Sequence, residues 1–185
     1  MNQKPPYKSI TQLPYHCVPA CLTMVLDRRK VKHGTQDEIG YELGLVVPNE
    51  IAHEFKKIRT GKKPIAGYGT QVAKKQYSIN HFFQKYKIKL REEYYPPEKI
   101  RDYAEFIADN ISKSNDLIVC FNNELLFGSG DWGHVCVIQG IDRNVVMLID
   151  PERSVPKKRR TELPNLIEAI KKHGEEKRGG FWVIS

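Results

Sequence analysis

The chain has 185 residues, a length that suits one domain or two small lobes around a shared cleft. Hydrophobic residues make up 40% of the sequence, which is enough for a packed core and argues against a disordered chain. The net charge is +8, with basic residues spread along the chain and one dense run at residues 157–160, which we interpret as a solvated loop.

Membrane and nucleic-acid functions find little support in the sequence. No stretch approaches the roughly 18 apolar residues of a membrane helix, and the polar residues 1–6 do not resemble a secretory signal. We therefore expect a cytoplasmic protein without membrane contact, unless an export signal has been removed. The basic residues leave an acidic partner open. Nucleic-acid binding is not expected, because zinc-finger spacing and a glycine–aromatic RNA-binding signature are both missing.

Residues 1–115 are predicted to be mainly helical. Three prolines make residues 1–14 irregular, and glycines make residues 61–69 a loop. The helix that starts at Cys17 has apolar residues at helical spacing, and Thr35 with Glu38 forms a capping box for the next helix. Helices are predicted at residues 17–29, 35–43, 48–59, 78–86 and 98–112, and a strand at residues 87–93.

Residues 116–185 are predicted to be mainly sheet, because short runs of Val, Ile and Leu alternate with turn signals. The whole chain, 1–185, then forms one α+β domain in which a helical lobe packs on an antiparallel sheet. The cleft between the two lobes is the expected place for chemistry. Strands are predicted at residues 117–121, 135–141, 145–149 and 181–184, a loop at 128–133, and a helix at 161–172.

Cys17 is the candidate nucleophile, because it stands where an apolar helix starts. The first N–H groups of a helix are unpaired and carry partial positive charge, which stabilises a thiolate. Cys21 lies one turn further and is expected to pack in the core. The cysteine spacing matches no C-x-x-C zinc pattern, so no metal or cofactor is expected, although His16 and His134 could complete a set with this pair.

His134 is the candidate base. It opens an apolar strand after a glycine-rich loop, whereas the other histidines lie next to Cys17 in sequence or in polar segments. Asp150 closes the following strand, and a three-residue loop centred on Asp142 would place residues 134 and 150 opposite each other on one sheet face. Asp150 could then orient the imidazole. The alternatives are a structural histidine and a turn-forming Asp-Pro.

Gln12 is the candidate oxyanion donor. The backbone N–H of Cys17 can supply one hydrogen bond to a developing oxyanion, and the Gln12 amide, five residues upstream, can supply a second. Without the neighbouring candidates, Gln12 would be an ordinary loop glutamine.

Three strings carry a family resemblance: QLPYHCVPACLTMVL at 12–26, GHVCVIQGID at 133–142 and VMLIDP at 146–151. They resemble the papain-like cysteine peptidase superfamily, and within it the free-standing relatives of the bacteriocin-processing, double-glycine leader peptidases. In that family a Gln precedes a Cys at a helix start, and a Gly-His opens a strand whose partner ends in Asp-Pro. The resemblance implies a papain-like fold with Gln12 as oxyanion donor, Cys17 as nucleophile, His134 as base and Asp150 as its orienting group.

The resemblance implies a thiol hydrolase that cleaves a peptide or amide bond of a peptide or protein substrate through a thioester. With an amine in place of water, the same residues would make an acyltransferase or transpeptidase. A catalytically inactive binding protein of the same fold is the third alternative. Val18 and His16 depart from the family, which often has Gly and an acidic residue at these positions. The segment between Cys17 and Leu117 has no pattern that identifies the substrate.

Overall fold

The computed structural model describes residues 1–64, 67–128 and 130–185, so residues 65, 66 and 129 of the predicted loops 61–69 and 128–133 lie outside the described part. The α-helices are α1 (Cys17–Arg28), α2 (Gln36–Glu42), α3 (Ile79–Lys85), α4 (Tyr103–Ser112), α5 (Asn123–Phe127) and α6 (Leu163–His173). The strands are β1 (Val46–Val47), β2 (Arg59–Thr60), β3 (Glu92–Tyr95), β4 (Asp116–Asn122), β5 (Gly133–Asp142), β6 (Val145–Ile149), β7 (Lys158–Glu162) and β8 (Gly180–Ile184). In the described part, no helix has the length and apolar character needed to cross a membrane.

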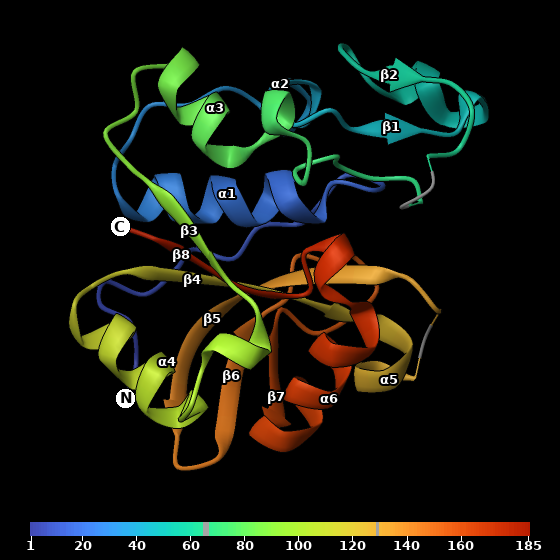
Figure 1. The fold of residues 1–185 in the computed structure, drawn as a ribbon. Coiled ribbons are helices and arrows are strands. Elements are labelled where there is room, and N and C mark those ends of the chain that lie inside the picture. The colour runs from blue at the N-terminus through green and yellow to red at the C-terminus, as the bar shows by residue number, and fades with distance from the viewer. Residues whose placement is uncertain (65–66, 129) are drawn as a thin grey trace.

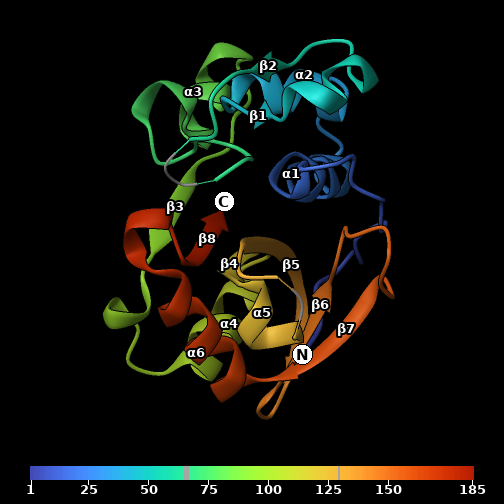
Figure 2. The same cartoon turned by 90° about the vertical axis from the view of Figure 1, so that its right-hand side faces the viewer.

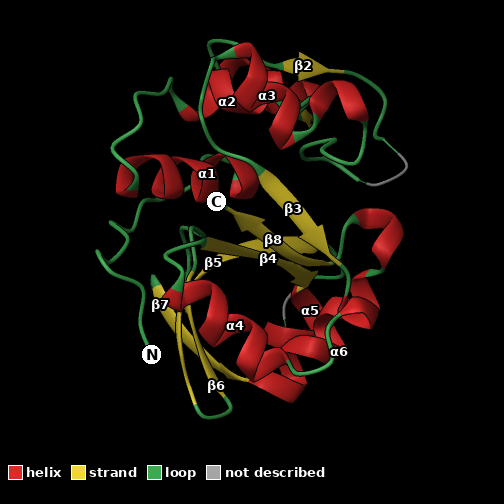
Figure 3. Ribbon diagram, turned by 60° about the vertical axis from the view of Figure 1, so that its left-hand side comes forward, coloured by secondary structure: helices red, strands yellow, loops and turns green. Residues whose placement is uncertain are grey.

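Helix α1 runs between two lobes (Figure 1). On one side lie α2, α3 and the small β1–β2 sheet, and on the other lies a six-stranded antiparallel sheet in the order β3-β8-β4-β5-β6-β7. Helices α4 and α6 cover the sheet face turned away from α1, so helices flank the sheet on both sides (Figures 2 and 3). Both β3 and α4, although they precede residue 116, are thus part of the sheet lobe.

The central strand β4 is covered by helices on both faces of the sheet, which explains its continuous apolar run. Successive strand residues point to opposite faces, so a strand with helices on both sides needs a continuous apolar run, which in β4 is Leu117 to Phe121 between the polar ends Asp116 and Asn122. All seven residues of β4 are buried. Ile118 packs in the core under α1 and α3, and Val119 packs in the core under α4 and α6.

The predicted ends of several elements need correction. Strand β3 starts at Glu92 rather than at residue 87, because its partner β8 ends at Ile184, opposite Glu92. Helix α4 starts only after Asp102, whose carboxylate accepts a hydrogen bond from the Glu105 N–H at 2.9 Å. The basic run at 157–160 is not a solvated loop, because most of it belongs to β7, which pairs with β6.

The β5–β6 hairpin differs from its predicted register. Its turn has two residues, Arg143 and Asn144, and Asp142 pairs with Val145. The register then shifts between Ile138 and Gly140, so Gln139 forms a bulge. Beyond the bulge Val137 pairs with Ile149, so residues 134 and 150 do not lie directly opposite each other as predicted. The bulge nevertheless affects these two residues, because a shift of one residue changes which side chains of β5 and β6 lie on the same face of the sheet.

Asp116 fixes the far end of α1 to the sheet. Its side chain is fully buried and accepts hydrogen bonds from Arg28 at 2.5 Å, Arg29 at 2.6 Å and the Tyr7 hydroxyl at 2.6 Å. Both guanidinium groups also donate to the Ser114 carbonyl. A buried carboxylate with two cations and a hydroxyl has its charge and its hydrogen-bonding capacity satisfied.

Replacing this carboxylate should destabilise the fold strongly. Asp116→Ala leaves the buried Arg28 without its charge partner, so we expect a loss of about 3–5 kcal/mol in the free energy of unfolding. Urea denaturation measures it. Asp109→Ala is the control, because Asp109 forms an exposed pair with Lys113 and its removal should change stability by about 0.5 kcal/mol or less. Equal losses in the two variants would contradict this role for Asp116.

Candidate active site

Cys17 is the first residue of α1 and is half-buried, whereas the next nine residues of the helix are fully buried. The preceding residue, His16, makes no capping hydrogen bond with its side chain, because its Nδ1 contacts the Pro14 carbonyl at 2.6 Å. The first turn of α1 also lacks acidic residues. The positive end of the helix is therefore left to act on the Cys17 sulfur.

His134 and Asp150 form a buried pair. The distance from His134 Nε2 to Asp150 Oδ1 is 2.8 Å, and the two residues are 5% and 0% exposed. Asp150 follows Ile149, so the register of the hairpin places it beside Cys136, two residues along β5 from His134. Alternate strand residues share a face, and the contact is therefore diagonal across the hairpin rather than between directly opposed residues.

The bulge makes this diagonal contact geometrically available. A hairpin that kept the pairing of Asp142 with Val145 along its whole length would put His134 and Asp150 on opposite faces. Because Gln139 has no residue opposite it in β6, the pairing of the two strands moves by one residue. The side chains of His134 and Asp150 then point to the same face of the sheet.

Asp150 receives two further hydrogen bonds. The Glu152 N–H donates to Oδ1 at 2.9 Å, and the Arg159 guanidinium donates to Oδ2 at 3.1 Å. The Arg159 guanidinium also lies 3.2 Å from the centre of the Phe127 ring. Both carboxylate oxygens are therefore occupied, which holds the carboxylate plane in one orientation.

These contacts shift the pKa values of the pair. Burial acts to lower the pKa of His134, but interactions with Cys136, Asp150 and Cys17 outweigh burial and hold it well above its usual value. Burial raises the pKa of Cys136 to about 11, so at neutral pH Cys136 is an uncharged thiol and Asp150 supplies the charge that favours the imidazolium.

Asp150 shows the complementary shift. Burial acts to raise its pKa, but His134, the Glu152 N–H and Arg159 lower it below the usual value. Asp150 is therefore a carboxylate at neutral pH, beside an imidazole that readily holds a second proton.

Gln12 is linked to the same loop. Its backbone N–H donates to the Pro151 carbonyl at 2.8 Å, and its side-chain Nε2 donates to Glu152 Oε2 at 2.8 Å. Because a carboxylate only accepts, the amide nitrogen must face Glu152, which fixes the orientation of the amide. Glu152 thus contacts Gln12 with its side chain and Asp150 with its backbone.

Comparisons with known proteins identify the family of the chain. A model of the Peptidase_C39 like family matches residues 2–176. The chain belongs to the peptidase C39-like family. A search of curated proteins gave no significant match to the sequence.

Solved structures of C39-like peptidases share the fold. A C39-like peptidase from Bacillus anthracis has a TM-score of 0.62 at 13% identity, over 97% of this chain and 94% of that chain. The peptidase domain of Streptococcus ComA, a bifunctional ABC transporter involved in a quorum-sensing pathway, has a TM-score of 0.51 at 18% identity, over 97% and 96%. A double-glycine motif protease from an AMS/PCAT transporter, solved with its leader peptide, has a TM-score of 0.50 at 13% identity, over 98% and 94%. The predicted papain-like α+β fold, a helical lobe on an antiparallel sheet, is confirmed.

Several residues of this C39-like site were not found from the sequence. Arg159 lay in a run interpreted as a solvated loop, although its position in β7 places it against Asp150. The sequence gives no signal for Glu152, since nothing in it links this residue to Gln12. His173 lies in a polar segment of the sequence, where a surface position is expected, but it is only 9% exposed. Its ring lies where a side chain at Gly133 would be, which requires glycine immediately before His134.

The four residues that could form a metal site according to the sequence do not come together as one set: Cys17, Cys21, His16 and His134. His16 is buried against Phe55, with its Nε2 3.5 Å from Asp37, and the Cys21 thiol donates to the Val135 carbonyl. In the described part, a different group places its ligand atoms within 4.8 Å of one another: His134, Cys136 and Asp150. The Arg159 guanidinium on Asp150 opposes a further cation there.

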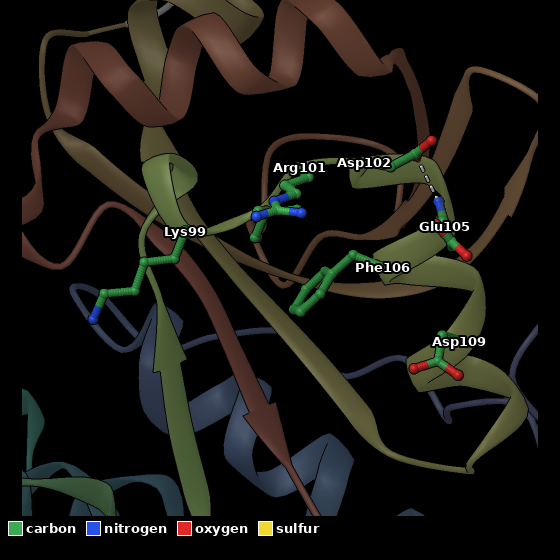
Figure 4. A pocket seen from close by; sticks show the side chains of 7 residues that line it. Lys99, Arg101, Asp102, Glu105, Phe106 and Asp109 are labelled. Atoms are coloured by element: carbon green, nitrogen blue, oxygen red, sulfur yellow. Dashed lines mark hydrogen bonds between the residues drawn. The ribbon is translucent and has the colours of Figure 1, made fainter.

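A surface pocket of about 260 Å³ lies away from these residues, beside the start of α4. Its lining is mostly charged and includes Lys99, Arg101 and Glu105 (Figure 4). Helix α4 covers the sheet face opposite to α1, so this pocket is remote from Cys17.

The pKa of His134 should depend on Asp150. In Asp150→Asn we expect a clearly lower His134 pKa, measured by NMR titration of the imidazole, because the carboxylate that favours the imidazolium is gone. Asp27→Asn removes the partner of His33 at 3.0 Å and should leave the His134 titration unchanged.

The same shift predicts how stability changes with pH. A raised folded-state pKa stabilises the fold fully below the unfolded value of about 6.5, and this contribution is lost as the pH rises through the folded pKa. As the pH rises from about 6.5 through the folded pKa of His134, the free energy of unfolding should therefore fall less in Asp150→Asn than in the parent protein. An unchanged His134 titration in Asp150→Asn would refute the assignment.

Proposed function

We propose that this chain is a cysteine peptidase in which Cys17 is the nucleophile, His134 the general acid and base, and Asp150 the group that orients His134. The observation that carries the proposal is the buried contact of 2.8 Å between His134 Nε2 and Asp150 Oδ1, together with the interaction of His134 with Cys17 at a helix N-terminus. Family membership and the shared fold support peptidase chemistry.

The contact defines the proton path. Because Nε2 of His134 is engaged by Asp150, Nδ1 is the ring nitrogen left to exchange a proton with the Cys17 thiol. The thiolate attacks a carbonyl carbon, and the protonated imidazole gives its proton to the leaving amine, which departs as a thioester forms. Water then attacks the thioester and gives one proton to His134, which releases the carboxylic acid and leaves the Cys17 thiolate beside the protonated imidazole, as at the start of the cycle.

The developing oxyanion needs donors near Cys17. We assign the Cys17 backbone N–H and the Gln12 amide to this role. One N–H of the Gln12 amide is held by Glu152, which leaves the second N–H for the oxyanion. The substrate is a peptide, by analogy with the neighbour that was solved with its leader peptide.

Alkylation tests the thiol–imidazole pair without a known substrate. We expect iodoacetamide to modify Cys17 at pH 7 faster than it modifies a free thiol, and His134→Ala to slow this reaction about tenfold or more, as followed by mass spectrometry. His81→Ala is the control, because His81 is exposed on α3. A Cys17 rate equal to that of a free thiol, and insensitive to His134→Ala, would refute the proposal.

A peptide library shows which reaction follows. Products that appear with the parent protein and not with Cys17→Ala identify the cleaved bond by mass spectrometry. Hydrolysis adds water to the acyl fragment. Transfer to an added amine such as glycinamide would instead identify the acyltransferase that the same residues allow.

The oxyanion assignment makes a separate prediction. Gln12→Ala should lower kcat by about 10²–10³-fold with a smaller effect on KM, because an oxyanion donor acts mainly in the transition state. Glu152→Gln is the matched control. It keeps an acceptor for the Gln12 amide and should retain most of the activity. A Gln12→Ala variant with unchanged kcat would exclude Gln12 from this role.

A further inference from the structure

The positive charge of the chain is concentrated in one segment, contrary to the even spread inferred from the sequence. Residues 55–91 contain eleven Lys and Arg residues and no Asp or Glu. The rest of the chain has 19 basic and 22 acidic residues, so this segment accounts for the entire positive net charge. It lies within the segment between Cys17 and Leu117, which has no sequence pattern that identifies the substrate.

The described residues of this segment, 55–64 and 67–91, form the outer part of the N-terminal lobe. The segment follows the 3₁₀ helix Asn49–Glu54, passes through β2 and α3 and ends where β3 joins the large sheet. In Figure 2 it lies on the same side of α1 as α2, above the sheet. Ten of its eleven basic side chains are exposed, and Arg59 is half-buried.

Few of these charges are neutralised within the protein. All eleven residues belong to the described part of the chain, and among them only Lys85 forms an ion pair, with Glu42 at 2.6 Å. Lys57 and Arg59 lie over the Tyr41 ring, at 4.4 and 3.7 Å from its centre. Such contacts orient cations but do not cancel their charge, so a strong positive field remains over this lobe.

A chain of contacts joins the segment to the candidate nucleophile. The Lys63 ammonium lies 5.9 Å from the centre of the Tyr68 ring, and Tyr68 packs edge-to-face on Tyr15 with ring centres 5.7 Å apart. Tyr15 is two residues before Cys17. A backbone pairing between Val46 and Gly69 holds this part of the segment to β1. A ligand on the basic surface would therefore extend toward Cys17.

We propose that the eleven Lys and Arg residues of this segment form a docking surface for an acidic stretch of the peptide substrate, next to the bond that Cys17 attacks. The inference rests on the proposed function, and it adds the substrate class that the catalytic residues do not define. Uncompensated surface cations attract an acidic chain, accelerate its association and make its affinity fall with ionic strength.

A peptide fits this surface better than a nucleic acid. Binding of single-stranded nucleic acid needs free aromatic faces for base stacking as well as positive charge. Here the rings of Tyr41, Tyr68 and Tyr86 each already contact a Lys or Arg of the segment. Cys17 chemistry, moreover, acts on acyl carbon atoms, which a peptide offers at every residue.

The first measurement uses Cys17→Ala, which cannot form the thioester and so leaves the probe intact. Three fluorescein-labelled probes are compared by anisotropy: a 16-residue Glu/Gly/Ser peptide, the same peptide with Gln for Glu, and a single-stranded oligonucleotide of equal charge. We expect the Glu peptide to bind at least tenfold more tightly than the Gln peptide at low salt, with the difference shrinking as salt is raised.

Paired charge reversals locate the surface. Lys62→Glu with Lys63→Glu should weaken binding of the Glu peptide about tenfold. Lys99→Glu with Arg101→Glu makes the same change in net charge at the remote pocket of Figure 4 and should leave binding nearly unchanged. Thermal denaturation confirms that both variants fold.

Three results would overturn the proposal: equal binding of the Glu and Gln peptides, equal losses in the two double variants, or tighter binding of the oligonucleotide than of the Glu peptide. The alkylation of Cys17 is independent of this test. If acidic-peptide binding fails while His134-dependent alkylation holds, only the docking surface is wrong. If binding holds and alkylation fails, the surface serves a binding protein rather than a peptidase.

Discussion

The burial of α1 between two lobes is the constraint on which the rest of the structure depends. Nine consecutive residues, Val18 to Leu26, are buried, so the helix is fixed along its length by the sheet and by α2 and α3. Asp116 fixes its C-terminal end through Arg28 and Arg29. A helix that cannot slide or rotate presents its first residue at one place, and that residue is Cys17. The packing of α1 thus determines where the candidate nucleophile meets the hairpin that carries His134.

The charges around His134 are balanced by neighbours from separate parts of the chain. Asp150 bonds to the imidazole, and Arg159 and the Glu152 N–H satisfy its remaining acceptor capacity. Without Arg159, a fully buried carboxylate would depend on the imidazolium alone for its charge compensation. Glu152 links this group to Gln12, so the loop after β6 contacts both the Asp150 carboxylate and the candidate oxyanion donor.

Local patterns in the sequence were enough to predict α1, the capped helix α2 and the apolar strands, because their signals lie within a few neighbouring residues. The pairing of His134 with Asp150 was also predicted, but for the wrong reason. The expected three-residue turn would have placed them face to face, whereas the structure has a two-residue turn and a bulge. The roles of Arg159 and Glu152 depend on contacts between distant strands and loops, which residue types and spacing do not encode. The concentration of charge in residues 55–91 is present in the sequence, but uncharged residues divide its Lys and Arg residues into single positions and pairs, so it does not form one dense basic run.

The bulge at Gln139 has an effect beyond the register of its own hairpin. The Gln139 carbonyl accepts a hydrogen bond from the Gln3 N–H at 2.8 Å, and its side chain bonds to the Tyr7 N–H and the Gln3 carbonyl, each at 3.2 Å. The residue left out of the ladder is therefore the one that anchors the segment leading to Cys17. Deleting Gln139 would keep His134 and Asp150 on a common face, since the remaining pairs would then run without a shift. It would also remove these three hydrogen bonds to Gln3 and Tyr7, although Met1 and Asn2 would still pair with Ile141 and Gly140. A single residue thus links the register of the hairpin to the segment that leads to Cys17.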